Sequence, residues 1–128
     1  MRVLLDTHAF IWWLSGDKRL SVKARRTIAD EDNDVFVSAA SAWEVATKFR
    51  IGKLPKAGPL GVDFAREVRQ QAFIGLPVSL EHAQAAGALL GDHRDPFDRM
   101  LIAQAREDRM ALISNDTVFD AFDVQRIW

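Results

Sequence analysis

Val3-Leu4-Leu5-Asp6-Thr7 is the stretch that decides the fold of this chain. Three consecutive apolar residues followed at once by an acid and a hydroxyl are typical of a buried strand whose carboxyl end presents a carboxylate. In open parallel sheets, ligands bind in the crevice beyond the carboxyl ends of the strands. We therefore expect Asp6 to form one wall of an acidic metal pocket or, as the simpler alternative, to cap a helix that begins at Thr7 or His8.

Further short apolar segments alternate with helical patterns along the rest of the chain. The expected strands cover residues 35–38, 73–78, 110–113 and 124–128, and Pro77 places the third strand of the chain at a sheet edge. Strands that alternate with helices predict an α/β fold with a mostly parallel central sheet of four to five strands and helices on both faces. No linker or internal repeat divides residues 1–128, so we expect one domain.

Capping residues indicate where several helices begin. Ser21 and Ser79 each precede a helical pattern, and Asp95 stands directly before Pro96. Proline starts a helix cleanly because its missing N–H would have no intrahelical partner at that position. A further amphipathic helix is expected over residues 60–71.

The composition limits the compartment and the partners. The chain has 128 residues, 48% of them hydrophobic, and no cysteine, which excludes a disordered chain, a disulfide framework and a thiolate zinc site. No apolar run approaches the length of a membrane span, so we expect a soluble, cytoplasmic protein. With a net charge of −1, any nucleic acid has to be bound by a local basic patch.

Four acids stand at positions where a site could form: Asp6, Glu44, Asp98 and Asp116. Each also has a capping explanation; Glu44, for example, lies three residues after Ser41 and fits a capping box. A doubly wound sheet brings distant strand ends to one crevice, where several carboxylates would repel strongly unless a divalent cation relieved the repulsion. Oxygen ligands without cysteine or a histidine pair favour Mg²⁺ or Mn²⁺ over zinc.

The clearest concentration of positive charge follows Glu44 directly and consists of Lys48, Arg50, Lys53 and Lys56. A phosphate backbone could lie along these residues, or they could form an ordinary solvated face.

The successive motifs of the chain resemble a known family. The motifs are Leu4-Leu5-Asp6-Thr7, Ser38-Ala39-Ala40-Ser41-Ala42-Trp43-Glu44-Val45, the segment 93–105 with His93-Arg94-Asp95-Pro96-Phe97-Asp98-Arg99, and Ser114-Asn115-Asp116. Together they look like those of PIN-domain ribonucleases, specifically VapC-type toxins of bacterial toxin–antitoxin pairs. The resemblance covers nearly the whole chain. It implies a Mg²⁺-dependent endoribonuclease that is inhibited by a cognate VapB-type antitoxin and is often a homodimer.

The resemblance also implies that the four acids form the metal centre. On that basis Asp6 and Asp98 are expected to bind the metal directly, Glu44 to hold a metal water, and Asp116 to complete the cluster or bind a second ion. The other candidates are supporting residues: Thr7 and Asn115 as hydrogen-bonding partners, Arg94, Arg99 and Lys48 as phosphate-positioning residues, and His93 as a proton-transfer group.

Two other functions remain open at this point. A phosphatase with Asp6 as the covalent nucleophile is one, but phosphatases of the haloacid-dehalogenase type require a second Asp where this chain has His8. The other is a non-cleaving module that binds RNA or protein around a structural metal ion. For the antitoxin, exposed apolar residues are expected to form a groove, with Trp12, Trp13, Phe49 and Ile51 as the candidates.

Overall fold

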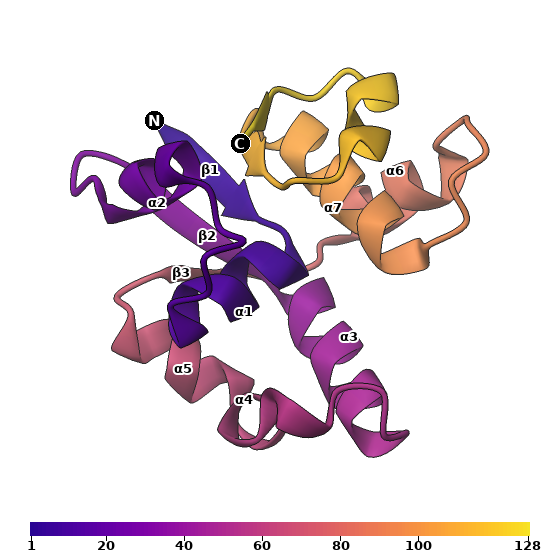
Figure 1. The fold of residues 1–128 in the computed structure, drawn as a ribbon. Coiled ribbons are helices and arrows are strands. Elements are labelled where there is room, and N and C mark those ends of the chain that lie inside the picture. Colours follow the sequence, from indigo (N-terminus) through magenta and orange to yellow (C-terminus); the bar gives the residue numbers. More distant parts are fainter.

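A five-stranded, fully parallel sheet in the order β3-β2-β1-β4-β5 forms the centre of the molecule, as a computed structural model that describes residues 1–128 shows (Figure 1). The strands are β1 (Arg2–Leu5), β2 (Asp34–Ser38), β3 (Ile74–Leu76), β4 (Ala111–Ile113) and β5 (Arg126–Ile127). The predicted α/β fold with a parallel sheet is confirmed. β3 and β5 lie at the edges, and the first strand of the chain lies in the middle.

Helices and 3-10 turns connect the strands. They are α1 (Thr7–Ser15), α2 (Val22–Ala29), α3 (Ala39–Arg50), η1 (Pro55–Ala57), α4 (Pro59–Val62), α5 (Phe64–Gln70), α6 (Leu80–Ala88), α7 (Pro96–Glu107) and η2 (Thr117–Phe122). No helix is both long and apolar enough to pass through a bilayer.

The alternation of side chains along β1 divides the core into two parts. Val3 and Leu5 face a cluster built with residues of α1, α2, α3 and α5, whereas Leu4 faces a second cluster built with α7 and η2. Because successive side chains of a strand point to opposite faces, the three buried residues of β1 serve both clusters. The sheet therefore carries helices on both faces, as expected.

The N-cap of α3 differs from the expectation. Ser38, not Ser41, caps this helix, and its hydroxyl accepts a hydrogen bond from the backbone N–H of Ala40. The helix thus begins one turn earlier than predicted, directly after β2. Ser41 is consequently a buried residue inside the helix, and the capping-box explanation for Glu44 is wrong.

The helix expected over residues 60–71 is also interrupted. It is divided into α4 and α5 by Asp63, whose side chain accepts from the N–H of Arg66 and caps the second piece. The caps predicted at Ser21, Ser79 and Asp95 are confirmed.

The tryptophans of α1 do not form an open groove. Trp12 is 7% exposed and packs edge-to-face against Trp128, with ring centroids 5.9 Å apart. Trp13 is partly covered, and its indole N–H donates to Gln71 Oε1. Of the candidate groove residues, Trp12 is therefore excluded, because its ring belongs to the core cluster that contains Val3 and Leu5.

Candidate active site

Asp6 occupies the carboxyl end of the central strand. Its backbone N–H donates to the carbonyl of Ile113 in β4, which fixes the residue at the carboxyl end of β1. The carboxylate accepts from the N–H of Ala9 at 2.7 Å, so it also caps α1. The side chain is nevertheless only 6% exposed and has no ion-pair partner. The alternative role of Asp6 as a helix cap is thus confirmed, and its burial leaves the predicted role in a metal pocket as a proposal.

Burial raises the pKa of Asp6 from 3.8 to about 6. Hydrogen bonds from the Ser114 hydroxyl and the Ala9 backbone, together with the charge of His8, oppose this rise, while the nearby charge of Asp98 adds to it. Removing a carboxylate from water disfavours its charged form, and a like charge nearby does the same. A cation at this position would relieve both effects.

Glu44 lies on α3 and is 4% exposed. Its Oε1 accepts from the Thr7 hydroxyl at 2.6 Å, and the Ser41 hydroxyl lies 2.9 Å from the same Thr7 oxygen. Its Oε2 forms an ion pair with Lys48, one helical turn further along. Thr7, the residue after Asp6, therefore connects the end of β1 to the Glu44 carboxylate.

Asp98 lies in the first turn of α7, which Pro96 begins and Asp95 caps. Its Oδ2 is 2.7 Å from Nε2 of His93. Burial is the main cause that raises the pKa of Asp98, and the charges of Asp95 and Glu44 raise it further, whereas His93 lowers it. Asp98 thus lies within electrostatic reach of both Asp6 and Glu44.

Asp116 has a different environment. It is exposed, and its Oδ1 accepts from the N–H of Val118, which caps η2. The negative charge of Asp116 helps to raise the pKa of Arg126. Asn115 beside it is exposed as well. The hydrogen bonds of Asp116 go to Ser114 and Val118 and to none of the other three acids.

No three His, Cys, Asp or Glu side chains come close enough together to hold a metal ion in this arrangement. Two of the candidate carboxylates instead contact basic side chains: Glu44 contacts Lys48, and Asp98 contacts His93. The donor set consists of oxygen atoms, the type that Mg²⁺ prefers. Asp6, buried without a cationic partner, fits a metal ligand in its chemistry.

The basic residues have separate positions. Lys48 is half-buried against Glu44, whereas Arg50, Lys53 and Lys56 are exposed. Arg94 is exposed in the loop before α7.

Arg99 donates to the backbone carbonyls of Leu89, Gly91 and His93. Its guanidinium therefore supports the loop that carries His93, a role that the sequence did not suggest.

Two contributors to the site escaped the sequence interpretation. Ser114 is fully buried at the end of β4, where its hydroxyl lowers the pKa of Asp6, and Ser41 is buried beside Thr7. A hydroxyl at the end of the strand paired with β1 was the available signal for Ser114. For Ser41 the signal was misleading, because the same residue also suited a helix cap.

Comparison with known proteins identifies the family. The model of the PIN domain matches residues 3–125. This chain belongs to the PIN-domain family. The curated relatives include ribonuclease VapC22 of Mycobacterium tuberculosis, which is 30% identical over 115 residues, covering 89% of this chain and 86% of that protein. Ribonuclease VapC16 of the same organism is 36% identical over 64 residues, which is 50% of this chain and 44% of the relative. The expected kinship with VapC-type PIN domains is confirmed.

Solved structures support the PIN fold. VapBC2 from Rickettsia felis, bound to a DNA fragment from its promoter, aligns with a TM-score of 0.72 and 13% identity over 98% of this chain and 97% of that one. VapC20 of Mycobacterium tuberculosis, a toxin that cleaves the sarcin–ricin loop, aligns with a TM-score of 0.67 and 19% identity over 95% of both chains. At these identities the likeness concerns the fold alone.

Proposed function

We propose that this PIN-domain protein is a Mg²⁺-dependent endoribonuclease that acts as the toxin of a toxin–antitoxin pair, with residues 1–128 as its nuclease domain. The observation that carries the proposal is the buried Asp6 carboxylate, which has no ion-pair partner and lies at the carboxyl edge of the sheet within reach of the Asp98 charge. The curated relatives named ribonuclease VapC support the reaction class.

Asp6 and Asp98 are the proposed direct ligands of the metal, with Glu44 oriented by Thr7 toward the same crevice. When bound, Mg²⁺ or Mn²⁺ would neutralise negative charge on the phosphate and would lower the pKa of a water molecule beside it. Asp116 is proposed to complete the four-carboxylate site from the adjoining turn, with Asn115 beside it. Arg94 and Lys48 are proposed to hold the phosphates of RNA, and His93 to accept or deliver a proton.

Lys48 and His93 limit the freedom of two of these acids. Each contacts a carboxylate that the proposal assigns to the metal centre, Lys48 through Glu44 Oε2 and His93 through Asp98 Oδ2. Such contacts keep buried negative charge compensated while no cation is bound. Arg99 positions His93 by holding the carbonyl groups of its loop. If Glu44 and Asp98 bound a cation, they would exchange their contacts with Lys48 and His93 for contacts with the metal. The side chains of α3 and of the loop before α7 would then have to rearrange.

The proposed partners follow from the same kinship. Neighbouring structures include VapBC complexes from Rickettsia felis and Salmonella typhimurium, both bound to DNA. For this chain we propose a VapB-type antitoxin as the inhibitor, a homodimer as the toxin assembly and the cytoplasm as the compartment. Expression should then arrest growth, and co-expression of a small protein from the neighbouring gene should relieve the arrest; unimpaired growth would contradict the toxin role but not the nuclease.

The decisive experiment is RNA cleavage by the purified protein with Mg²⁺, with Mn²⁺ and with EDTA. Asp98→Asn should abolish metal-supported cleavage without loss of the fold, because Asp95, not Asp98, caps α7. Circular dichroism checks the fold. Undiminished cleavage by this variant would refute the proposed site. Binding of RNA by the wild-type protein without cleavage under any divalent ion would favour the non-cleaving module instead.

A further inference from the structure

Gln104 is a fully buried polar side chain on α7, a helix whose other buried residues are apolar. An amide in such a place costs free energy unless its polar atoms find partners. The Gln104 carboxamide has them on both sides. Its Oε1 accepts from the Ser38 hydroxyl at 2.6 Å, and its Nε2 donates to the Pro77 carbonyl at 3.2 Å.

The two partners of Gln104 stand at the carboxyl ends of neighbouring strands. Ser38 is the last residue of β2 and caps α3, and Pro77 directly follows β3. Because Nε2 is held by the Pro77 carbonyl, Oε1 is directed at Ser38. The Ser38 hydroxyl is fixed as well, since it also accepts from the N–H of Ala40. One carboxamide therefore joins α7 to the point where β2 ends and α3 begins.

The elements joined in this way carry two of the candidate acids. Asp98 lies on α7 and Glu44 on α3, and the charge of Glu44 contributes to the raised pKa of Asp98. The Ser38–Gln104 bond is the only side-chain hydrogen bond between α7 and residues 38–50. It is thus the direct polar connection between the supports of the two carboxylates.

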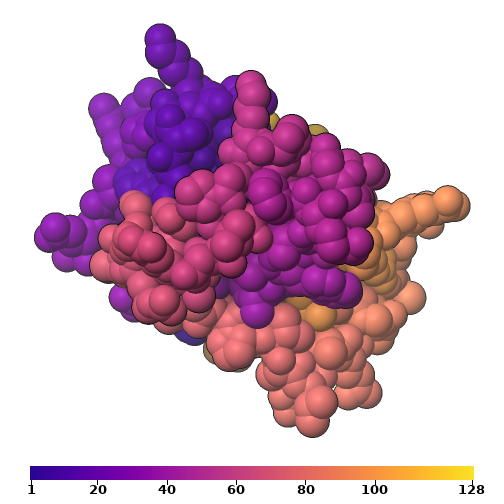
Figure 2. Space-filling model, turned by 90° about the horizontal axis from the view of Figure 1, so that it is seen from below, coloured from indigo at the N-terminus to yellow at the C-terminus, as the bar shows by residue number.

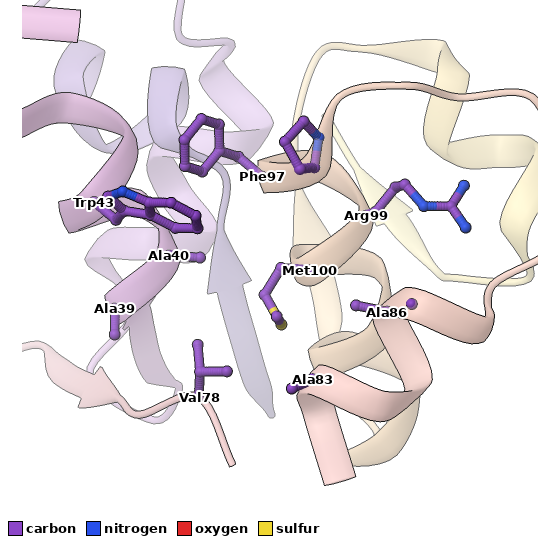
Figure 3. A pocket seen from close by; sticks show the side chains of 11 residues that line it. Ala39, Ala40, Trp43, Val78, Ala83, Ala86, Phe97, Arg99 and Met100 are labelled. Atoms are coloured by element: carbon purple, nitrogen blue, oxygen red, sulfur yellow. The ribbon is translucent and has the colours of Figure 1, made fainter. Parts of the chain in front are cut away.

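Apolar packing between these two helices is incomplete. Figure 2 shows the magenta surface of α3 beside the salmon and orange surface of the segment that contains α6. Beneath this boundary, an apolar cavity of about 450 Å³ separates α3 from α6 and α7. In Figure 3 the rings of Trp43 and Phe97 meet at one end of the cavity, with their centroids 5.0 Å apart, and Met100 projects into its middle.

A cavity between two helices leaves their relative position weakly determined. Hydrophobic burial is not directional, whereas a buried hydrogen bond specifies one arrangement of its donor and acceptor. The placement of α7 against α3 therefore depends strongly on the bond between Gln104 and Ser38.

We propose that Gln104 is a positioning residue: through Ser38 it fixes the placement of Asp98 relative to Glu44, so that both carboxylates can meet one divalent cation. The catalytic consequence rests on the proposed ribonuclease function, whereas the placement is a property of the fold alone. A displacement of about 1 Å in a reacting group can lower a rate about 100-fold. Gln104 is buried and away from solvent, so its loss should act on kcat rather than on KM.

Gln104→Met tests the role, because methionine has a similar length but no hydrogen-bonding amide. We expect kcat to fall and the Kd for Mn²⁺, measured by electron paramagnetic resonance, to rise, each by about 10- to 100-fold, with KM unchanged. Ile102→Val is the matched control, since Ile102 is equally buried on α7 and the smaller side chain lowers stability without touching the bond. Unchanged kcat and Kd in Gln104→Met, or equal changes in Ile102→Val, would overturn the proposal.

Ser38 provides a second pair of variants in case Gln104→Met does not fold, as judged by circular dichroism. Ser38→Ala removes the hydroxyl but keeps the Gln104–Pro77 bond, and Ser38→Thr retains a hydroxyl that can cap and donate. We expect the losses in Ser38→Ala and near wild-type values in Ser38→Thr. In the foldable case, Ser38→Ala added to Gln104→Met should lower kcat little further, because both remove one interaction. Equal values for Ser38→Ala and Ser38→Thr would contradict the role of the bond.

Spin-label distances test the placement without RNA or metal. The chain has no cysteine, so Ala46→Cys and Arg106→Cys place labels only at these exposed positions of α3 and α7. Pulsed electron resonance should show a shifted or broader distance distribution when Gln104→Met is added, and an unchanged one with Ile102→Val. If the wild-type protein neither cleaves RNA nor binds Mn²⁺, the proposed function fails, and this measurement alone decides the placement. An unchanged distribution in Gln104→Met would overturn it.

Discussion

Asp6 and Asp116 stand at the ends of neighbouring parallel strands and follow them in the same pattern, an apolar strand and then an acid followed by threonine. Both carboxylates cap the helix or turn that comes next. Yet Asp6 is 6% exposed with a pKa raised to about 6, whereas Asp116 is exposed and lies near Arg126. The difference arises from depth, because Asp6 follows β1 at once, while Ser114 and Asn115 carry the chain outward before Asp116. Local pattern alone therefore does not determine the chemistry of an acid.

The largest expected contrast between the two acids is in RNA cleavage. Asp6→Asn and Asp116→Asn both retain a good helix cap, since Asn and Asp cap equally well, so each removes a charge with little structural change. Loss of partners outside a metal's ligand shell costs about 10- to 100-fold in activity, and loss of a direct ligand should exceed that. We expect cleavage to fall more than about 100-fold for Asp6→Asn, the proposed direct ligand, and about 10- to 100-fold for Asp116→Asn, which completes the site from the exposed turn, measured as kcat/KM with Mg²⁺. Equal losses would place the two acids at the same metal.

The pH dependence of stability is the next contrast. The folded pKa of Asp6, about 6, lies above its unfolded value of 3.8, so the folded state binds more protons between these pH values and loses stability as the pH rises through this window. A shift of about 2 units corresponds to a cost of roughly 3 kcal/mol above pH 6 that is absent below pH 4. Urea unfolding of the metal-free protein at pH 4.5, 5.5 and 7.5 measures it. Asp6→Asn should lose this component, whereas Asp116→Asn should keep it because Asp6 is still present.

Metal binding should distinguish the acids in thermal stability, independently of cleavage. At a Mg²⁺ concentration ten times the Kd, binding to the folded state alone stabilises it by about 1.4 kcal/mol. We expect Mg²⁺ to raise the Tm of the wild-type protein and of Asp116→Asn, and to leave the Tm of Asp6→Asn unchanged. Calorimetry of EDTA-treated protein before and after addition of Mg²⁺ measures this shift. A full Mg²⁺ effect in Asp6→Asn would mean that Asp6 is not a ligand.

The smallest effect concerns capping at Asp116. Asp116→Ala removes the acceptor of the Val118 N–H and should lower the free energy of unfolding by about 1 kcal/mol, whereas Asp116→Asn should change it little. Chemical denaturation of the two variants side by side provides the measurement. Equal destabilisation by Asn and Ala would show that the charge, rather than the hydrogen bond, supports η2.

The sequence predicted the parallel sheet and the start of α7 because both depend on local signals: apolar runs bounded by turns, and Asp95 followed by Pro96. It did not predict which serine caps α3. Ser38 and Ser41 offer the same side chain, and the choice depends on where β2 ends and on the burial of Ser41 against Thr7. Such a choice is made by tertiary packing, which single-residue preferences do not contain.

The membership of the candidate site stays a prediction, but the contacts of its acids are now described. The sequence did not predict the engagement of Lys48 with Glu44 or of His93 with Asp98, which depends on helix faces and on a loop held by Arg99. Lys48 lies one turn after Glu44, so that pairing was available from spacing. The His93 contact was not, because the loop before α7 has no regular periodicity.

The strand order also bears on synthesis at the ribosome. β1 is made first, but its neighbour β4 arrives only when residues 111–113 have been translated. Pairings between such distant segments form late, since the intervening chain must be closed into a loop before they form. A nascent chain lacking its last two strands therefore exposes one flank of β1 and lacks the Ser114 hydroxyl beside Asp6. An incomplete polypeptide also lacks the Ile113 carbonyl to which the Asp6 N–H donates, so the backbone at Asp6 is fixed only once β4 has been made.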